Sequence, residues 1–153
     1  MRSLPLAGKP FHDALTALVF RVCEGHDVRA TVDAEGRLEN LPEFVAGSML
    51  LIVQEAVHNA LKHARPMRIE VQVRAGVDDG PLVVQVADDG VGFHVGSQPG
   101  PREGHFGIQG MRERAERLGG RLDVRNRPGG GTIVEVHVQR RDYDAELDAP
   151  AAG

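Results

Sequence analysis

Apolar side chains recur every three or four residues in three segments of the chain, which is the spacing of one helix face. This pattern predicts helices over residues 11–24 and 41–64, and a shorter helix that carries Met111, Ala115 and Leu118. A glycine or a proline follows each segment within two residues, as is typical of helix ends. The second helix would have about six turns. Its predicted buried face consists of Val45, Met49, Ile52, Val53, Ala56, Val57, Ala60 and Ala64.

Five other segments have the short, alternating apolar pattern of strands with one buried face. They are residues 28–32, 69–73, 82–87, 122–126 and 132–138. The second and third of these strands flank a turn of sequence Asp-Asp-Gly-Pro, so we expect them to form a hairpin. Three helices and five strands in this order predict an α+β fold, a two-layer sandwich in which the helices cover one face of a mixed sheet.

The length and composition of the chain limit its class. The 153 residues, of which 41% are apolar, suffice for one domain but not for two full domains. We assign residues 1–140 to this domain and residues 141–153 to a polar, alanine-rich tail that is expected to be disordered. The net charge of −4 and the aromatic content of 4% argue against a general nucleic-acid surface.

The same composition gives an expectation for the compartment. Cys23 is the single cysteine, so no internal disulfide can form, and we expect a reducing, cytoplasmic environment. No segment approaches the roughly 18 uncharged apolar residues of a membrane span, and the first residues lack the pattern of a signal peptide. We therefore expect no membrane contact by this domain.

Polar side chains form the opposite face of the helix predicted over 41–64. Glu55, Asn59 and Lys62 follow one another at offsets of four and three residues, so they align along the helix. Periodicity alone favours a solvated face here. A carboxylate, an amide oxygen and an ammonium group within two turns would also suit a metal ion and a phosphate, and Lys62 is one of only two lysines in the chain.

Glycine is concentrated in the second half, where fourteen of the nineteen glycines lie between Gly76 and Gly131. In residues 88–92 a strand runs into an Asp-x-Gly-x-Gly pattern, which is either a simple turn or a place where a ligand approaches the backbone. Residues 104–111 open a helix, and amides bared by glycine at a helix N-terminus can bind an anion. The alternative for this second segment is a flexible connector.

Four segments occur together in an order that is far more specific than any one of them. They are QEAVHNALKHA at residues 54–64, DDGVGF at 88–93, GIQGMRER at 107–114 and GGGT at 129–132. Together they resemble the N box, the G1 and G2 boxes and the final strand motif of the GHKL ATPases, a superfamily that includes gyrase, a heat-shock chaperone, histidine kinases and MutL. They are most similar to the ATP-binding domain of bacterial sensor histidine kinases of the nitrate-sensor and desaturase-sensor subfamily. The resemblance covers roughly residues 4–138 and implies a Bergerat-type ATP-binding fold.

The resemblance implies roles at both ends of an ATP molecule. At the adenine end, Asp88 would accept a hydrogen bond from the amino group of the base. Thr132 would support that contact, directly or through water. Gly90 and Gly92 would leave room for the base.

At the phosphate end, the resemblance implies that Asn59 ligates Mg²⁺ and that Lys62 and His63 face the phosphates. Glu55 has the position of the general base in hydrolysing relatives, and in the kinases it would orient or activate the transfer chemistry. Lys62 and Glu55 are thus the candidate catalytic residues.

Other implied features concern the lid and the histidines. The backbone from Gly107 to Gly110 would cap the phosphates, and the loop between residues 93 and 104 would form a short ATP lid. His105 lies in the lid region, and its role stays open. His12 lies in the first helix of the domain, so we expect it to be a surface or packing residue and not the phosphorylated histidine.

The function implied by the resemblance is that of a protein histidine kinase in two-component signalling. The γ-phosphate of Mg-ATP would pass to a histidine on a dimerisation domain, which we expect to lie outside this chain, and then to an aspartate on a response regulator. Autophosphorylation by this chain alone is not expected, and a membrane anchor elsewhere in the full-length kinase stays open. Two alternatives remain: a stand-alone serine kinase of the anti-sigma type, and a nucleotide-binding module without phosphotransfer.

Overall fold

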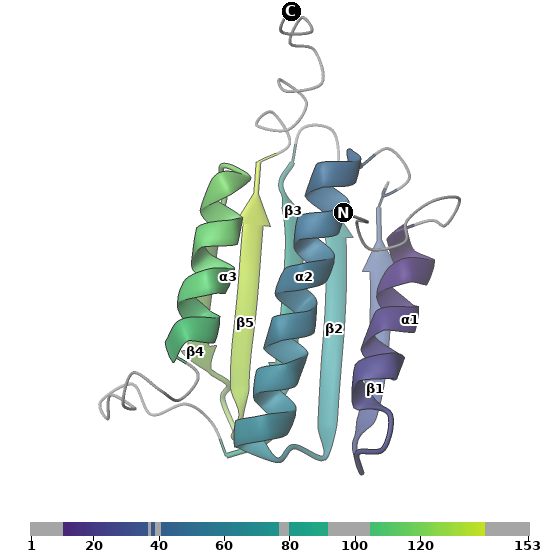
Figure 1. Ribbon diagram of the computed structural model, residues 1–153, viewed down its shortest axis with the longest axis vertical. Helices are drawn as coiled ribbons and strands as arrows, with labels where there is room; N and C mark the ends of the chain where they lie inside the picture. Colours follow the sequence, from purple (N-terminus) through teal and green to yellow (C-terminus); the bar gives the residue numbers. More distant parts are fainter. Residues whose placement is uncertain (1–10, 37, 39–40, 77–79, 92–104, 140–153) are drawn as a thin grey trace, which may run out of the picture.

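The computed structural model describes residues 11–36, 38, 41–76, 80–91 and 105–139, without the side chains of the first two residues of the last range (Figure 1). Within these ranges the helices and strands follow one another in the predicted order. The elements are α1 (Phe11–Cys23), β1 (Arg29–Glu35), α2 (Glu43–Asn59), η1 (Ala60–Ala64), β2 (Arg68–Ala75), β3 (Leu82–Asp88), α3 (His105–Arg117), β4 (Arg121–Asn126) and β5 (Thr132–Val138).

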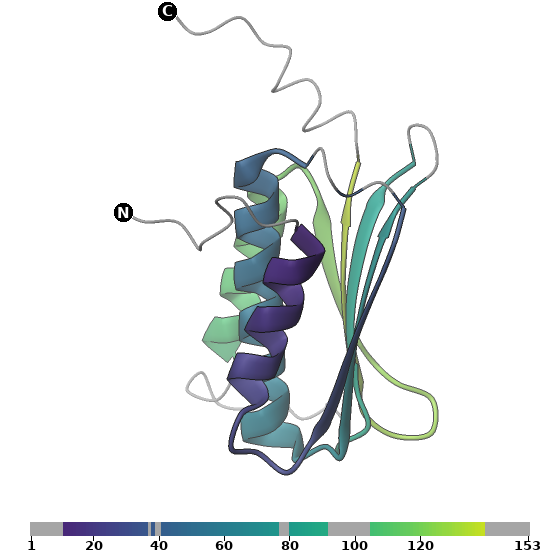
Figure 2. The same ribbon diagram turned by 90° about the vertical axis from the view of Figure 1, so that its right-hand side faces the viewer.

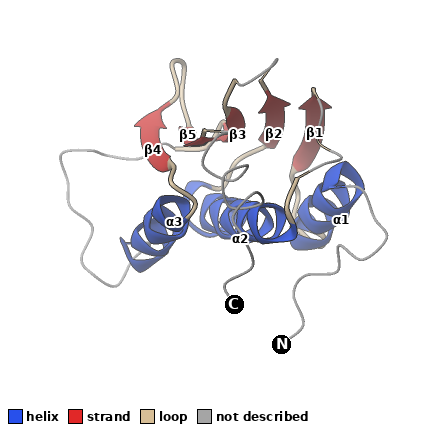
Figure 3. Cartoon of the chain, turned by 90° about the horizontal axis from the view of Figure 1, so that it is seen from above, coloured by secondary structure: helices blue, strands red, loops and turns tan. Residues whose placement is uncertain are grey.

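The strands form one mixed sheet in the order β1-β2-β3-β5-β4. β1 and β2 are parallel, because the chain crosses between them through α2, whereas the other neighbouring pairs are antiparallel. In the part of the chain that the structure describes, all three α-helices cover the same face of the sheet (Figures 2 and 3). The predicted α+β sandwich is therefore confirmed, and so is the hairpin of β2 and β3.

α2 lies in the middle of the helical layer, between α1 and α3 (Figure 3). All eight apolar positions predicted for its buried face are buried in the core. They meet alternate residues of the sheet, such as Ile69, Val71 and Val84, each of which contributes about 1.5–3 kcal/mol by leaving water. By length and composition, Glu43–Ala64 is also apolar enough to cross a membrane, but half of its most apolar window is buried in this fold, as in other core helices.

The end of this central helix differs from the prediction. After Asn59 the chain does not continue as an α-helix: Ala60–Ala64 form a π-helical turn, in which hydrogen bonds join residues five apart. Arg65 then ends the helix in the left-handed conformation, with a φ of 48°. Apolar spacing could not reveal this change, because Ala60 and Ala64 are buried with either hydrogen-bond pattern.

Candidate functional site

The motif-bearing segments meet at one edge of the fold, at the lower end in Figure 1. The end of the central helix, the end of β3, the start of β5 and the first turn of α3 all lie there. The end of β3 adjoins the start of β5 because these strands are antiparallel, with Ala87 opposite Ile133. The fold thus brings together segments that are up to about 80 residues apart in the sequence.

Asp88, the last residue of β3, carries the only charged side chain that is buried among the described residues, with 4% of its surface exposed. Its Oδ1 accepts a hydrogen bond of 2.8 Å from the amide of Gly90. Burial raises the pKa of this carboxyl above its ordinary value, although hydrogen bonds from the amides of Gly90 and Thr132 oppose that shift. A buried acceptor of this kind is further stabilised by any ligand that brings it an N–H donor.

Gly131 explains how Thr132 comes so close to Asp88. Gly131 has a φ of +112°, and a Cβ atom at this position would lie 1.8 Å from the carbonyl oxygen of Asp88. No side chain fits there, so only glycine permits the contact between the start of β5 and the end of β3. The sequence placed this glycine in the final motif without assigning it a role.

Asp89 has a structural role that the sequence analysis missed. Its Oδ1 accepts hydrogen bonds from the amides of Met67 and Arg68, at 2.8 and 2.9 Å. These bonds, above all the one from Arg68, lower the pKa of the Asp89 carboxyl. The side chain therefore ties the turn after β3 to the start of β2. The adjacent pair Asp88 and Asp89 was a signal for this role in the sequence. Neighbouring residues on an extended chain point in opposite directions, so the two carboxylates were bound to have different surroundings.

Gly90 lies against the end of η1. A Cβ atom at this position would be 2.3 Å from the carbonyl oxygen of Ala64, which also accepts a hydrogen bond of 3.1 Å from the amide of Val91. The space left by the missing side chain is thus filled by the backbone of Ala64, whereas the sequence analysis expected it to leave room for a base. Gly92 lies outside the described residues.

Glu55 and Asn59 lie on the half-buried side of α2 that faces α3. The Cβ atom of an alanine at position 107 would lie 2.8 Å from Glu55 Oε2 and 3.0 Å from Asn59 Nδ2. Gly107 therefore lets the first turn of α3 approach both polar side chains. A carboxylate oxygen and an amide beside a helix N-terminus form an environment that suits an anion and a hard cation together.

The other residues predicted for the phosphate end are exposed or lie outside the described part of the chain. Lys62 and His63 are exposed on the π-helical turn that follows Asn59. Gly110 lies in α3 but is exposed, and an added Cβ atom would meet no other atom within 4 Å. The predicted lid at residues 93–104 and the side chain of His105 lie outside the described part of the chain.

Comparisons with known proteins agree with this geometry. The family model described as "Histidine kinase-, DNA gyrase B-, and HSP90-like ATPase" matches residues 45–142. The nitrate/nitrite sensor protein NarQ of Escherichia coli is 44% identical over 88 residues, which are 58% of this chain and 15% of NarQ. The signal transduction histidine-protein kinase/phosphatase DegS of Brevibacillus brevis is 34% identical over 103 residues, 67% of this chain and 25% of DegS. The chain thus spans between about a seventh and a quarter of the length of these relatives.

Solved structures show the same fold. The histidine kinase domain of the Erythrobacter litoralis EL346 blue-light activated histidine kinase is 30% identical, with a TM-score of 0.68 that covers 92% of this chain and 66% of that one. The ATP binding domain of PrrB from Mycobacterium tuberculosis has a TM-score of 0.64 over 85% of this chain and 93% of that one, at 18% identity, which shows the fold alone. The family match, the relatives and the fold together identify the chain as a member of the histidine kinase-, DNA gyrase B- and HSP90-like ATPase family, of the kind found in sensor histidine kinases.

Proposed function

We propose that this domain binds Mg-ATP at the edge formed by Asp88, Thr132, Glu55 and Asn59, and transfers the γ-phosphate to a histidine on a partner domain. The observation that carries the proposal is the buried carboxylate of Asp88, which two backbone amides hold at the end of a central strand. A buried carboxylate costs stability unless it is well paired, so its retention is best explained by a ligand that donates to it.

The adenine end of the ligand is assigned to Asp88. Its oxygens can accept a hydrogen bond from the exocyclic amino group of adenine, while guanine presents a carbonyl oxygen at the corresponding position. Thr132 would support this contact from the start of β5, next to the amide that already bonds the carboxylate. The site should therefore discriminate ATP and ADP from GTP.

The phosphate end is assigned to the contact between α2 and α3. The amides in the first turn of α3 and the positive end of its dipole favour phosphate oxygens. Asn59 supplies an oxygen donor of the kind that Mg²⁺ prefers, and when bound this ion would neutralise phosphate charge. Glu55 would orient the acceptor histidine, and the exposed cations Lys62 and His63 would contact the phosphates.

The proposed histidine kinase function implies two protein partners. A phosphoacceptor histidine on a dimerisation domain would receive the phosphate, and a response regulator would then accept it on an aspartate. We also propose a cytoplasmic location for the domain, since ATP and response regulators are found there. The relatives named as sensor kinases favour this proposal over an anti-sigma-type serine kinase.

Calorimetry with ATP, ADP and GTP tests the binding part of the proposal. Asp88→Asn should weaken ATP and ADP binding by roughly 2 to 3 kcal/mol, about 30- to 150-fold in Kd, because an acceptor is partly replaced by a donor that faces another donor. Asp33→Asn, which changes an exposed aspartate on β1, is the matched control and should bind like the wild type. Unchanged affinity in a folded Asp88→Asn protein would remove the adenine assignment.

Phosphotransfer needs a separate assay with a supplied histidine-bearing dimerisation domain. Labelled phosphate should appear on that domain and be labile in acid, as expected for phosphohistidine. ATP binding without transfer to any such domain would favour the nucleotide-binding module, and transfer to a serine would favour the anti-sigma type. The chain alone should acquire no label, and a label on His12 would contradict the assignment.

A further inference from the structure

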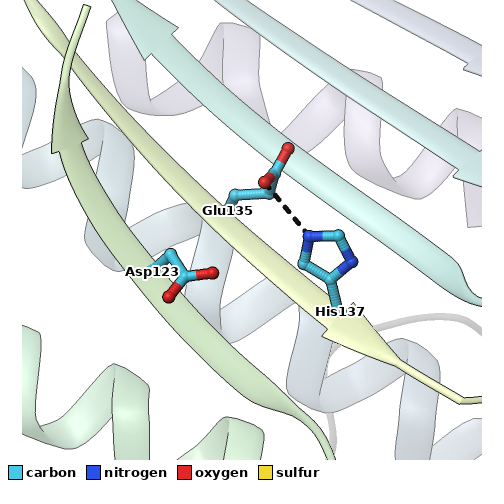
Figure 4. Close-up of side chains that lie close together, drawn as sticks. All are labelled: Asp123, Glu135 and His137. Carbon is cyan, nitrogen blue, oxygen red and sulfur yellow. Dashed lines mark hydrogen bonds and ion pairs between the residues drawn. The ribbon is translucent and has the colours of Figure 1, made fainter.

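Asp123, Glu135 and His137 lie together on the face of the sheet opposite the helices (Figure 4). Asp123 of β4 is the direct partner of Glu135 of β5, and His137 follows Glu135 by two residues, so all three side chains share one face. One potential ligand atom from each lies within 4.8 Å of the others. The cluster is separate from the ATP edge, because along β5 Glu135 is about 10 Å and His137 about 17 Å from Thr132 at roughly 3.4 Å per residue, and residues three apart on a strand point to opposite faces of the sheet.

The spacing of the donor atoms is close to that of a metal site. His137 Nε2 lies 3.1 Å from Glu135 Oε1. Two ligands that bind a tetrahedral ion at about 2.0–2.1 Å are about 3.3 Å apart, so this pair already has nearly the required separation. Asp123 needs only a rotation of its side chain to complete the set, since its Cα atom is fixed opposite Glu135 by the strand register.

Glu135 is held in place by its surroundings. Its side chain is only 14% exposed, and Gln85 of β3 donates a hydrogen bond of 3.2 Å to its Oε2, which leaves Oε1 directed toward His137. Hydrogen-bonded neighbours of this kind orient metal ligands in many proteins.

Two arginines compete for the carboxylates. Arg125 Nη1 lies 3.2 Å from Glu135 Oε1, and Arg121 Nε lies 3.5 Å from Asp123. Both arginine side chains are largely exposed, at 47% and 72%, and ion pairs in such positions contribute little to stability. A divalent ion that binds His137 together with the carboxylates can displace both arginines from them. Replacement of Arg125 by an uncharged residue should make metal binding easier.

We propose that Asp123, Glu135 and His137 bind a divalent transition-metal ion, with Zn²⁺ as the best fit. One imidazole and two carboxylates are a common ligand set for Zn²⁺, and three protein ligands leave a fourth position for water. Mg²⁺ is not expected here, because it prefers oxygen ligands in octahedral geometry. This site is independent of nucleotide binding.

The test is calorimetric titration of Zn²⁺, and separately of Mg²⁺, into the metal-free, nucleotide-free, untagged 153-residue chain. We expect one Zn²⁺ per chain with micromolar affinity and no Mg²⁺ binding. His137→Ala and the isosteric Glu135→Gln should each weaken Zn²⁺ binding at least tenfold, whereas His26→Ala, which removes an exposed histidine elsewhere, should not. Arg125→Gln should tighten binding several-fold, because it removes the competing cation.

Circular dichroism in EDTA establishes that each variant is folded. Absence of Zn²⁺ binding by the folded wild-type chain would overturn the proposal, and so would wild-type affinity in His137→Ala. Loss of binding in Cys23→Ser with retention in His137→Ala would place the ion elsewhere. Weaker binding in Arg125→Gln would show that the arginine supports the site, in contradiction to the competition described above.

Discussion

Replacement of Gly107 by alanine should separate folding stability from phosphotransfer. A glycine-to-alanine change inside a helix stabilises by about 0.5–1 kcal/mol. At position 107, however, the new Cβ atom would lie 2.8 Å from Glu55 Oε2 and 3.0 Å from Asn59 Nδ2. Both neighbours are ends of flexible side chains, so they can rotate away, at about 0.5–1.5 kcal/mol for each strained rotamer. For two side chains this cost is about 1–3 kcal/mol against the gain of about 0.5–1 kcal/mol, so the variant should lose between about 0 and 2.5 kcal/mol and remain folded.

Phosphotransfer by the folded variant should also become slower. If Glu55 and Asn59 position the metal and the acceptor, a displacement of up to 1 Å in either side chain should slow phosphotransfer by about ten- to a hundredfold. Gly47→Ala is the matched control, because Gly47 is a helical glycine of α2 outside the site and its Cβ atom would meet nothing within 4 Å. This control should gain about 0.5–1 kcal/mol, which corresponds to about 1–4 °C in Tm, without loss of activity.

The assays are thermal unfolding of the isolated chain and phosphotransfer rates in a reconstituted kinase that contains its dimerisation domain. Equal transfer rates for the Gly107→Ala and Gly47→Ala kinases would refute the reasoning. That result would mean that Glu55 and Asn59 are merely polar residues on a helix face, as periodicity alone suggested.

Three further predictions concern residues at the same edge. Asp88→Asn should stabilise the nucleotide-free fold relative to the wild type, and this gain should grow as the pH rises above 3.8, because the raised pKa of Asp88 means that its ionisation costs stability. Urea unfolding at several pH values measures the difference in stability, and a difference that does not change with pH would contradict the prediction. Asn59→Ala should abolish the Mg²⁺ enhancement of ATP affinity while metal-free ADP binding stays nearly intact, and equal losses with and without Mg²⁺ in calorimetry would make Asn59 structural. Gly131→Ala should destabilise the fold by several kcal/mol in chemical unfolding, because its Cβ atom would overlap the Asp88 carbonyl at a positive φ; a loss below about 1 kcal/mol would mean that β5 shifts freely.

Most of the fold was predictable because its elements have strong, simple periodicity. Every predicted helix and strand appears in the described chain, since one face of each element is buried or partly buried against the other layer. Local motifs also located Asp88, Asn59 and Gly107. The π-helical turn was not predictable, because a change in backbone hydrogen bonding leaves the apolar pattern unaltered.

Contacts between distant segments were the other limit of the sequence. Asp89 bonds amides that lie 21 and 22 residues away, and Gly90 is required by the backbone of Ala64, so neither role is visible in a local window. Likewise, the register of β4 and β5 is what places His137 beside Glu135 and Asp123. Such roles depend on which strands are neighbours, and a single sequence does not specify strand order.

The burial of Asp88 connects stability to ligand binding in this domain. The fold keeps a carboxylate whose ionised form is disfavoured by burial, and the amides of Gly90 and Thr132 offset only part of that cost, since the net effect is a raised pKa. A donor from a bound nucleotide would offset more of it, so nucleotide binding should lower the pKa of Asp88 and stabilise the fold most strongly at neutral pH. A residue that weakens the nucleotide-free domain would then also be one through which ATP stabilises it. Asp88→Asn should therefore reduce the Tm increase produced by ATP, even though it raises the Tm of the free domain.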